Sequence, residues 1–452
     1  MPPVVRQLAE WCVGVQGADI PNATAELLPL RLLDTTGLIF AGTATPAVAA
    51  ARSLVETLGG APQSTMSGSI DRVPAAAAAL VHGVAAHCFD FDDTIEESVV
   101  HPGSVVVPTV VALAEAGNTA DTDFRAAIAV GYEVAARIGA VAGRRFHLRE
   151  MHPTGVVGPI AAAAAAGRVR GMPAEKISWA MGLACSMAGG LRAYARDGGW
   201  SKWLHVGWAA HGGIIAADLA ARGFRGPEYV LNGGSDLYSA LLYGETLDRS
   251  PLLDGLGTIW RSAAAQFKLY PCAHVIHPFI DAVLALMRQH DLQTSDVAEI
   301  ECTIAPWAAA IVCEPNAAKL RFDTALEVIG SLPYQLAVAA LDGHVGLDAL
   351  EPTTRARADI AALASRVKYR KDEHLGRSFD GVVNIRVASG RSFGMPARLP
   401  GNDPAKVQEK FVTLTEPALG PSASHAAADR ILQTGHWRSV VEVLRWLPCS
   451  GS

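Results

Sequence analysis

The sequence predicts a mainly α-helical fold with a smaller α+β part, and three observations support this class. The 452-residue chain is 50% hydrophobic and only 18% charged, which indicates a large buried core. Helical periodicity continues from the N-terminus to about residue 265, beyond which alternating polar and apolar residues appear. We therefore expect a large all-helical domain over residues 1–266, completed by 401–452, and a smaller α/β lid domain inserted over 267–400.

The helical part contains amphipathic and alanine-rich segments. Asp123 is expected to cap a helix whose apolar residues, from Phe124 to Ile138, share one stripe, and Gly143 is expected to close it. The alanine-rich run at residues 161–166 allows helix axes to approach closely, because its side chains are small. The tail beyond residue 403 returns to a helical pattern, so we assign it to the same domain.

The inserted part contains two strand-like segments. Residues 297–304 and 383–387 alternate polar with apolar side chains, and residues 388–391 predict a hairpin turn after the second strand. Between the two strands, helices are expected to open near Thr324 and to cover residues 354–366. This mixture of strands and helices is the basis for the lid domain.

Composition excludes several classes of protein. The net charge is −6 and no run of Lys or Arg occurs, so nucleic-acid binding is not expected. The seven cysteines are scattered and form no C-x-x-C pair, which favours reduced thiols over a disulfide frame or a zinc site. The N-terminus lacks a secretory signal, and the longest apolar runs are shorter than the roughly 18 residues of a membrane span. We expect a cytoplasmic protein with no nucleic-acid or membrane partner.

His-Pro pairs occur three times, at His101, His152 and His277, and each pair opens an apolar run. Proline is favoured at the first helical position, so each histidine is expected at or just before a helix N-cap. A helix N-terminus binds carboxylates and lowers the pKa of an adjacent imidazole, which keeps that ring neutral and basic. Three such ends converging would hold a small polyanionic acid beside neutral bases. The alternative is three ordinary helix starts whose histidines face solvent.

Three aspartates crowd the segment 87–94, at Asp90, Asp92 and Asp93. Their repulsion requires a raised pKa or a cationic or histidine partner. One interpretation is acid–base chemistry in which Asp90 orients a histidine. A divalent metal held by aspartate and histidine is a second interpretation, and a solvated acidic turn is a third. Because the ligand spacing is not compact, we predict no metal.

Two basic segments are further candidates. Lys202 lies between two tryptophans in the glycine-rich segment 197–208, shortly before His205. Aromatic neighbours would desolvate Lys202, which favours an acid–base role or a carboxylate anchor, whereas a structural cation–π pair is the alternative. Lys268 and His274 lie at the expected junction of the two domains, where clefts are common.

Several of these motifs together resemble the MmgE/PrpD family, which includes 2-methylcitrate dehydratases, cis-aconitate decarboxylases and iminodisuccinate epimerases. The matching motifs, in the order of the family, are Asp-Phe-Asp-Asp-Thr at 90–94, His-Pro-Gly-Ser at 101–104, His-Pro-Thr-Gly at 152–155, Lys-Trp-Leu-His-Val-Gly-Trp from 202, Lys-Leu-Tyr-Pro-Cys at 268–272 with His277, and Ser-Leu-Pro-Tyr at 331–334.

The resemblance implies a cleft between the helical and lid domains and a homodimeric assembly. It also implies an enzyme that needs no cofactor and acts on a small carboxylate by proton transfer. The active-site residues implied by the matching positions are Asp90, Thr94, His101, His152, Lys202, His277 and Tyr334, with Lys268, His205 and His274 close by.

One segment departs from the decarboxylase branch of the family. Ile95-Glu-Glu-Ser98 stands where those enzymes carry a Trp-His-Pro insert, and two carboxylates near the pocket would repel a tricarboxylate. We therefore predict a dehydrating lyase for a small hydroxy di- or tricarboxylate, such as a 2-methylcitrate-like acid. The alternatives are an epimerase of a small dicarboxylate, a decarboxylase of a cis-aconitate-like acid, a metal-dependent hydrolase and a non-catalytic binding protein.

The predicted reaction divides the work among few groups. His101 or His152 removes the proton α to a carboxylate, while Lys202 and helix N-termini stabilise the enediolate-like anion. His277 or Tyr334 then protonates the leaving hydroxyl.

Overall fold

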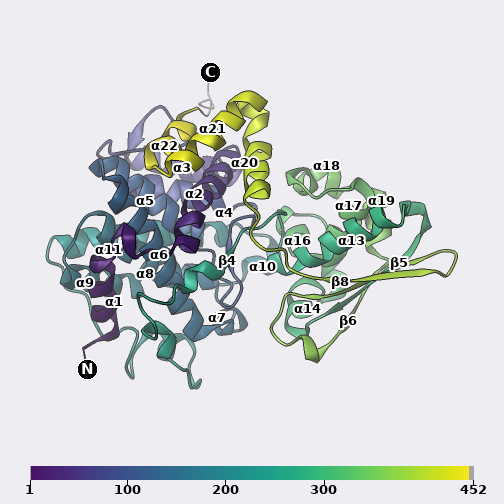
Figure 1. The fold of residues 1–452 in the computed structure, drawn as a ribbon, viewed down its shortest axis with the longest axis horizontal. Helices are drawn as coiled ribbons and strands as arrows, with labels where there is room; N and C mark the ends of the chain where they lie inside the picture. Colours follow the sequence, from purple (N-terminus) through teal and green to yellow (C-terminus); the bar gives the residue numbers. More distant parts are fainter. Residues whose placement is uncertain (1, 447–452) are drawn as a thin grey trace.

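The computed structural model describes residues 2–446, which form a large helical part and a smaller α+β part side by side (Figure 1). Cys449, the seventh cysteine, and the end of the C-terminal tail lie outside the described residues. The helices of the large part are α1 (Val4–Gly14), α2 (Asn22–Gly42), α3 (Pro46–Leu58), α4 (Ala75–His87), α5 (Gly103–Gly117), α6 (Asp121–Ala142), α7 (Arg145–Leu148), α8 (Pro153–Val169), α9 (Ala174–Cys185), α10 (Tyr194–Asp197), α11 (Ser201–Ala221) and α12 (Leu237–Leu241).

The last three helices return to this large part, where they are coloured yellow in Figure 1. They are α20 (Pro404–Leu419), α21 (Pro421–Thr434) and α22 (Trp437–Arg445), and α20 packs against α2. The predicted helix around residues 123–143 is α6, whose N-cap is Ala120, three residues before the expected cap Asp123, and whose C-cap is Gly143, with φ 55°.

Small residues let α4, α8 and α11 pack closely at the centre of the large part. A Cβ atom on Gly83 of α4 would lie 2.8 Å from the Cα atom of Gly207 on α11, so these two helices meet backbone against backbone. The alanines at 161–166 of α8 are fully buried. This close packing brings the end of α4 and the starts of α8 and α11 together, and these ends carry His87, His152 and Lys202.

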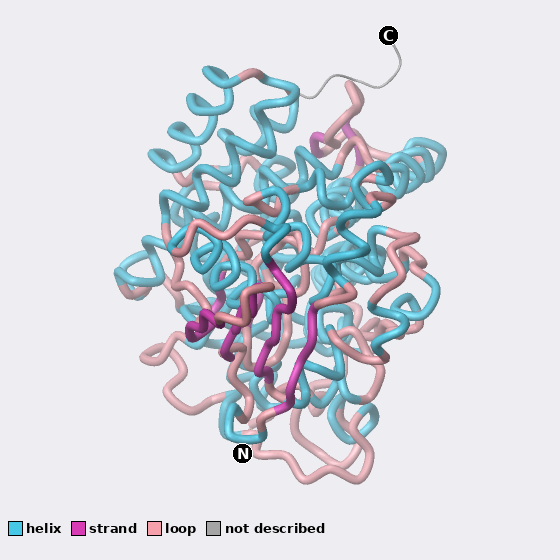
Figure 2. The backbone as a smooth tube through the Cα atoms, turned by 90° about the vertical axis from the view of Figure 1, so that its right-hand side faces the viewer, coloured by secondary structure: helices cyan, strands magenta, loops and turns pink. Residues whose placement is uncertain are grey.

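The small part is built on a mixed four-stranded sheet with strand order β6-β5-β7-β8. In Figure 2 these strands lie side by side toward the viewer. The strands are β5 (Val297–Ile304), β6 (Val367–Lys371), β7 (Gly381–Val387) and β8 (Ser392–Ala397), and the helices are α13 (His277–Gln289), α14 (Pro306–Val312), α15 (Asn316–Lys319), α16 (Ala325–Ile329), α17 (Leu332–Asp342), α18 (Pro352–Arg355) and α19 (Ala358–Ala364).

The predicted strands are present, with a hairpin between β7 and β8, and Thr324 caps α16 as expected. Strand β6, parallel to β5, was not predicted because only Val367 of its five residues is buried, so it lacks an alternating pattern. The helix expected over residues 354–366 is instead two short helices. Arg357 separates them in an extended conformation, in which its guanidinium pairs with Asp342 and Asp359.

Buried apolar side chains form two separate clusters. The first takes residues from Val5 to Phe267 and from Val407 to Leu444, whereas the second runs from Cys272 to Ala397. On this basis we propose the domain division 1–266 with 401–452, and 267–400, although Phe267 itself packs into the first cluster.

Within residues 2–446 no single helix is long and apolar enough to cross a membrane. Helices α2 and α3 pass such a test only as a pair, and they are bent by 88° where they join.

Candidate active site

A cavity of about 270 Å³ lies between the large and small parts. Two short strands close the junction beside it, because β3 (Thr94–Ile95) pairs with β4 (Ala265–Gln266). The sequence-predicted residues that line the cavity are Asp90, Thr94, His101, His152, Lys202, Lys268 and His274. Further lining residues that the sequence did not single out are His147, Arg192, Tyr194, Trp307, Lys319, Arg321 and Phe379.

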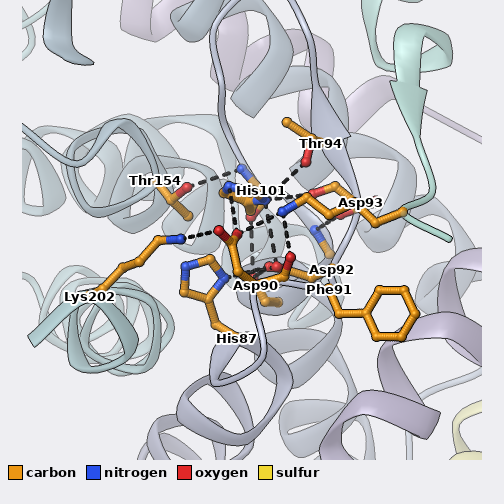
Figure 3. A network of polar contacts seen from close by, with 12 residues as sticks. His87, Asp90, Phe91, Asp92, Asp93, Thr94, His101, Thr154 and Lys202 are labelled. Carbon is orange, nitrogen blue, oxygen red and sulfur yellow. Dashed lines mark hydrogen bonds and ion pairs between the residues drawn. The ribbon is translucent and has the colours of Figure 1, made fainter. Parts of the chain in front are cut away.

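Asp90 is the centre of the charged network in Figure 3. Its carboxylate lies 2.7 Å from the Nζ atoms of both Lys202 and Lys268, and Lys268 also donates to the Asp90 main-chain carbonyl at 2.6 Å. Burial opposes the charge, but the two ammonium groups outweigh burial and hold the pKa of Asp90 well below its usual range. The residue has φ 51°, a left-handed conformation that aspartate tolerates better than most residues.

His101 is held in one tautomer by its neighbours. Its Nδ1 atom lies 2.9 Å from the main-chain carbonyl of Asp93, which can only accept, so Nδ1 carries the proton. The Nε2 atom is therefore the unprotonated nitrogen of the neutral ring. Burial lowers the pKa of His101 to about 3, so the ring is neutral at physiological pH.

The expected orientation of His101 by Asp90 is not what the structure shows. The Asp90 Oδ1 atom lies 3.8 Å from His101 Nε2, which is too long for a hydrogen bond. Thr94 Oγ1 lies 3.2 Å from Nδ1, on the same side of the ring as the Asp93 carbonyl. The orienting contacts therefore come from Asp93 and Thr94, because the two lysines engage Asp90.

The other two aspartates have structural partners. Asp92 accepts from His87 Nδ1 at 2.8 Å and from the hydroxyl of Ser104. Asp93 accepts from the Tyr132 hydroxyl at 2.7 Å and from the amide of Gly103 at 2.8 Å. Burial raises the pKa of Asp93 to about 7. Because Asp93 occupies the N-terminus of α5, that helix end is not free to bind a substrate carboxylate.

His152 is the N-cap of α8, and it lines the cavity together with Pro153. Its ring is buried, both ring nitrogens lack a hydrogen-bond partner, and burial holds the pKa well below the usual value. The ring stacks on His87 with centroids 5.4 Å apart. Of the three His-Pro helix starts, this one places both a free imidazole and a helix N-terminus at the cavity.

The third His-Pro start does not reach the cavity lining. His277 is the first residue of α13; its Nδ1 accepts from the Leu269 amide at 3.4 Å, and its ring packs edge-on against His274. His274, by contrast, lines the cavity, and burial holds its pKa well below the usual value. Of this pair, the structure brings His274 to the site.

Tyr334 is also displaced from its expected place. It is fully buried in the core of the small part, where its hydroxyl donates to the Ala349 carbonyl at 2.6 Å. Tyr334 lies in the first turn of α17, whose N-cap is Ser331. Its ring packs in the core, and its hydroxyl proton is taken up by the bond to Ala349. The structure therefore does not bring the Tyr334 hydroxyl to this cavity.

His205 lies behind the cavity lining. It follows Lys202 by about one turn of α11, and its ring centroid is 5.5 Å from that of His152. A Cβ atom on Gly190 would lie 2.9 Å from His205 Nδ1, so this glycine allows the close contact. Burial lowers the pKa of His205 to about 4, which makes it a neutral support for His152.

The segment that argued against a tricarboxylate does not line the cavity. Glu96 is half-buried beside Arg144, with 3.7 Å between the charged atoms, and Glu97 is exposed. The two glutamates therefore give no direct repulsion within the pocket, and this reason for disfavouring decarboxylation is wrong.

Two groups of side chains place histidine nitrogens and aspartate oxygens close enough together to hold a metal ion. One set is His87, His101 and His152; a second combines His87 and His101 with Asp90 and Asp92, and within each set the atoms lie within 4.8 Å of one another. However, Asp90 already bonds two lysine ammonium groups, which would repel a divalent cation. The donor set therefore fits an anionic ligand better than a metal.

Comparisons with known proteins match both parts of the chain. Residues 6–250 match the family model of the MmgE/PrpD N-terminal domain, and residues 270–434 match that of the C-terminal domain. Similar proteins include the cis-aconitate decarboxylase of Mus musculus, 28% identical over 80% of this chain and 75% of that protein.

Two further relatives carry the same name. The enzyme of Homo sapiens is 34% identical over 57% of this chain and 54% of its own length, and that of Aspergillus terreus is 28% identical over 64% and 61%. The chain thus aligns with little more than half the length of these two relatives. Because both family models match and together cover most of the sequence, the chain belongs to the MmgE/PrpD family.

Proposed function

We propose that this protein is a lyase that transfers a proton next to a carboxylate of a small di- or tricarboxylic acid. One observation carries the proposal: the neutral imidazole of His101, with its unprotonated Nε2, and that of His152, whose ring nitrogens have no hydrogen-bond partner, share a cavity with the lysine-bound Asp90. Neutral imidazoles are bases, and nearby ammonium groups stabilise the anion that proton removal creates. The residues suffice for this chemistry without a cofactor.

The first step is proton abstraction. His101 Nε2 takes the proton from the carbon α to a carboxylate, and the electron pair of the broken C–H bond moves into that carboxylate as an enediolate. Lys202 and the N-terminus of α8 stabilise the developing negative charge. The Asp93 carbonyl stabilises the imidazolium that forms, because it accepts from Nδ1.

Dehydration is the first candidate for the second step. The enediolate electrons form a C=C bond, the C–O bond breaks, and the hydroxyl leaves as water with a proton from the protein. His152 or His274 takes the acid role that was expected of His277 and Tyr334, because both line the cavity. A bound polyanion raises the pKa of a neighbouring imidazole, which allows it to carry this proton.

Decarboxylation is the second candidate, and two observations favour it. The similar proteins named above are cis-aconitate decarboxylases, and Glu96 and Glu97 lie outside the cavity lining. This reaction needs no prior proton abstraction: the C–C bond to a carboxylate breaks, CO₂ leaves, the electron pair stays on the carbon as a carbanion, and an imidazolium, formed because the bound polyanion raises the imidazole pKa, protonates that carbon. Epimerisation would use the same two bases without a leaving group.

Proton NMR in D₂O distinguishes these reactions. The purified enzyme is given cis-aconitate, 2-methylcitrate and short hydroxydicarboxylates. A new alkene from a hydroxy acid indicates dehydration, loss of one carbon indicates decarboxylation, and deuterium at Cα alone indicates epimerisation. We expect His152→Ala to abolish the reaction. His211 lies on α11 outside the cavity lining and its ring stacks on Trp208, so we expect His211→Ala to retain the reaction. Absence of turnover and exchange in the wild type contradicts the proposal, and activity lost on chelation favours a metal-dependent hydrolase.

We also propose a homodimer in a reducing, cytoplasmic compartment. Helix α11 and its N-cap expose Trp200, Leu204 and Trp208, which are each about half exposed and four residues apart, so they form one apolar stripe. The six described cysteines are free thiols, which supports a reducing compartment. Light scattering during gel filtration measures the mass of the wild type and of Trp208→Lys. A wild type with the mass of a monomer, unchanged in Trp208→Lys, contradicts the dimer.

A further inference from the structure

The charges that line the cavity are unequal. Among the described lining residues, the carboxylates are Asp90, Glu314 and Glu327, and the cations are Lys202, Lys268, Arg192, Lys319 and Arg321. Each carboxylate already has its own cation. Asp90 binds the two lysines, Glu314 lies 2.6 Å from Lys371, and Glu327 lies 3.4 Å from Arg321. The positive charge left without a carboxylate inside the cavity is that of Arg192 and Lys319.

Lys319 is the less satisfied of these two cations. Its Nζ atom donates one hydrogen bond, to the Gly330 carbonyl at 2.8 Å, so two of its three protons remain available. Among the described residues, no carboxylate lies within ion-pair distance of this ammonium group. Burial lowers the pKa of Lys319 to about 8, which shows the cost of holding this charge without an anion. A lysine with pKa about 8 is still mainly cationic at neutral pH.

Arg192 faces the same space from the large part. One terminal nitrogen bonds Glu150 at 3.2 Å, but Glu150 is outside the cavity lining and its side chain is 67% exposed. The Arg192 Nε atom is buried and has no hydrogen-bond partner. The charge of Arg192 also lowers the pKa of Lys319, so the two cations are close enough to repel each other.

The main chain near each cation is hydrogen-bonded to the main chain at or beside a histidine of the cavity. Gly190, two residues before Arg192, accepts from the His152 amide at 2.8 Å. Ile329, next to the carbonyl that Lys319 binds, accepts from the Ala273 amide at 3.0 Å, beside His274. The backbone that carries Arg192 and the backbone that binds the Lys319 ammonium group are therefore tied to the segments of His152 and His274, one on each side of the cleft.

We propose that Arg192 and Lys319 form a subsite for the second carboxylate of the substrate, which makes the preferred ligand a dicarboxylate that bridges the two domains. This inference rests on the proposed function, because it concerns the same cavity. A carboxylate there would accept from Arg192 Nε and from the free Lys319 protons, and it would neutralise the excess charge. A monocarboxylate would leave these donors unpaired, so the subsite discriminates between the two classes.

Titration calorimetry with unreactive acids tests the subsite. Succinate is compared with butyrate, which has the same chain length and one carboxylate fewer. We expect the wild type to bind succinate at least about tenfold more tightly than butyrate, and Lys319→Met to lose about tenfold for succinate alone, about 1.4 kcal/mol. Lys319→Arg retains most of the preference. The matched control is Lys176→Met, because Lys176 also donates to a main-chain carbonyl, of Ala221 at 2.6 Å, outside the cavity.

The outcomes separate this inference from the proposed function. An unchanged succinate affinity in Lys319→Met overturns the subsite, and so does an equal loss for succinate and butyrate. If Lys319→Met does not fold, Arg192→Met gives the same test from the other domain. Because neither acid reacts, a preference for succinate that depends on Lys319 supports the subsite even where no turnover is found. Turnover with an unchanged KM in Lys319→Met supports the function and rejects the subsite.

Discussion

The two walls of the cavity differ in how their charges are satisfied. On the large-domain wall, the Asp90 carboxylate has a lysine on each oxygen, and the rings of His87, His101 and His152 are buried against one another. On the small-domain wall, Lys319 makes one hydrogen bond, and Arg321 lies beside Glu327 with its side chain 57% exposed.

This difference indicates a division of labour. Groups that move protons must be held in fixed geometry, and a buried network of ion pairs, hydrogen bonds and packed rings provides it. Groups that recognise a ligand gain most when they are unpaired before it arrives. Apart from Arg192, the large-domain wall is therefore organised for chemistry, and we infer that the small-domain wall, apart from His274, is organised for recognition.

The largest expected effect comes from removing the charge at the centre of the large-domain wall. Asp90→Asn preserves the shape and the left-handed backbone, which asparagine also tolerates, but leaves Lys202 and Lys268 without a counterion. Breaking a buried ion pair costs about 3–5 kcal/mol, so we expect the free energy of unfolding to fall by that amount in urea denaturation.

The small-domain wall provides the control for this substitution. Glu314→Gln removes a carboxylate that pairs with Lys371, but both side chains are at least about one-third exposed. Exposed pairs contribute about 0–1 kcal/mol, so little change is expected. Equal losses in Asp90→Asn and Glu314→Gln would show that the two walls do not differ.

The second prediction separates geometry from chemistry on the large-domain wall. His101→Asn retains a donor to the Asp93 carbonyl, because the asparagine amide stands near the place of Nδ1–H, but it removes Nε2. Loss of a general base reduces kcat about 10²- to 10⁴-fold. Deuterium exchange at the substrate Cα measures this step directly. Exchange at the wild-type rate would assign the base to another residue.

The sequence was most informative where a residue's local pattern also determines its place. The alternation in residues 297–304 predicts β5 because the sheet buries one face, and Gly143 predicts the end of α6 because it can adopt positive φ. Strand β6 and the wall residues Arg192 and Lys319 have no such pattern. They are brought to the sheet and to the cavity by contacts between distant segments, which one sequence does not display.

The sequence did not separate neighbouring candidates of the same type within one motif. His274 and His277 both follow Lys268, but the helix start at His277 turns that ring away from the cavity lining. Asp90 and Asp93 stand three residues apart, and the main-chain carbonyl of Asp93 rather than a carboxylate orients His101. Main-chain acceptors of this kind carry no side-chain signal.

The third prediction concerns pH and the large domain outside the cavity. His82 is buried and its pKa is lowered to about 4, so between about pH 6.5 and 4 the unfolded chain binds a proton that the native chain does not. Stability therefore falls as the pH is lowered through this window, by up to about 1.4 kcal/mol per pH unit for this histidine. Asp93, with its pKa raised to about 7, acts in the opposite direction, because its native form binds the extra proton as the pH falls.

His82→Gln tests this contribution. The glutamine oxygen can accept from the Ser67 amide, as His82 Nε2 does at 3.1 Å. We expect the dependence of unfolding free energy on pH between 4 and 6.5 to become shallower by about one proton, while activity is retained. An unchanged slope in urea titrations at several pH values would contradict the buried neutral state of His82.

The smallest expected effect lies in the core of the small domain. Tyr334→Phe removes the hydroxyl that donates to the Ala349 carbonyl and leaves that carbonyl unpaired, which costs about 1–3 kcal/mol of small-domain stability. Because Tyr334 does not line the cavity, kcat and KM are expected to stay within about twofold of wild type. A large fall in kcat at unchanged stability would instead show that the small domain moves during turnover and delivers this tyrosine to the substrate.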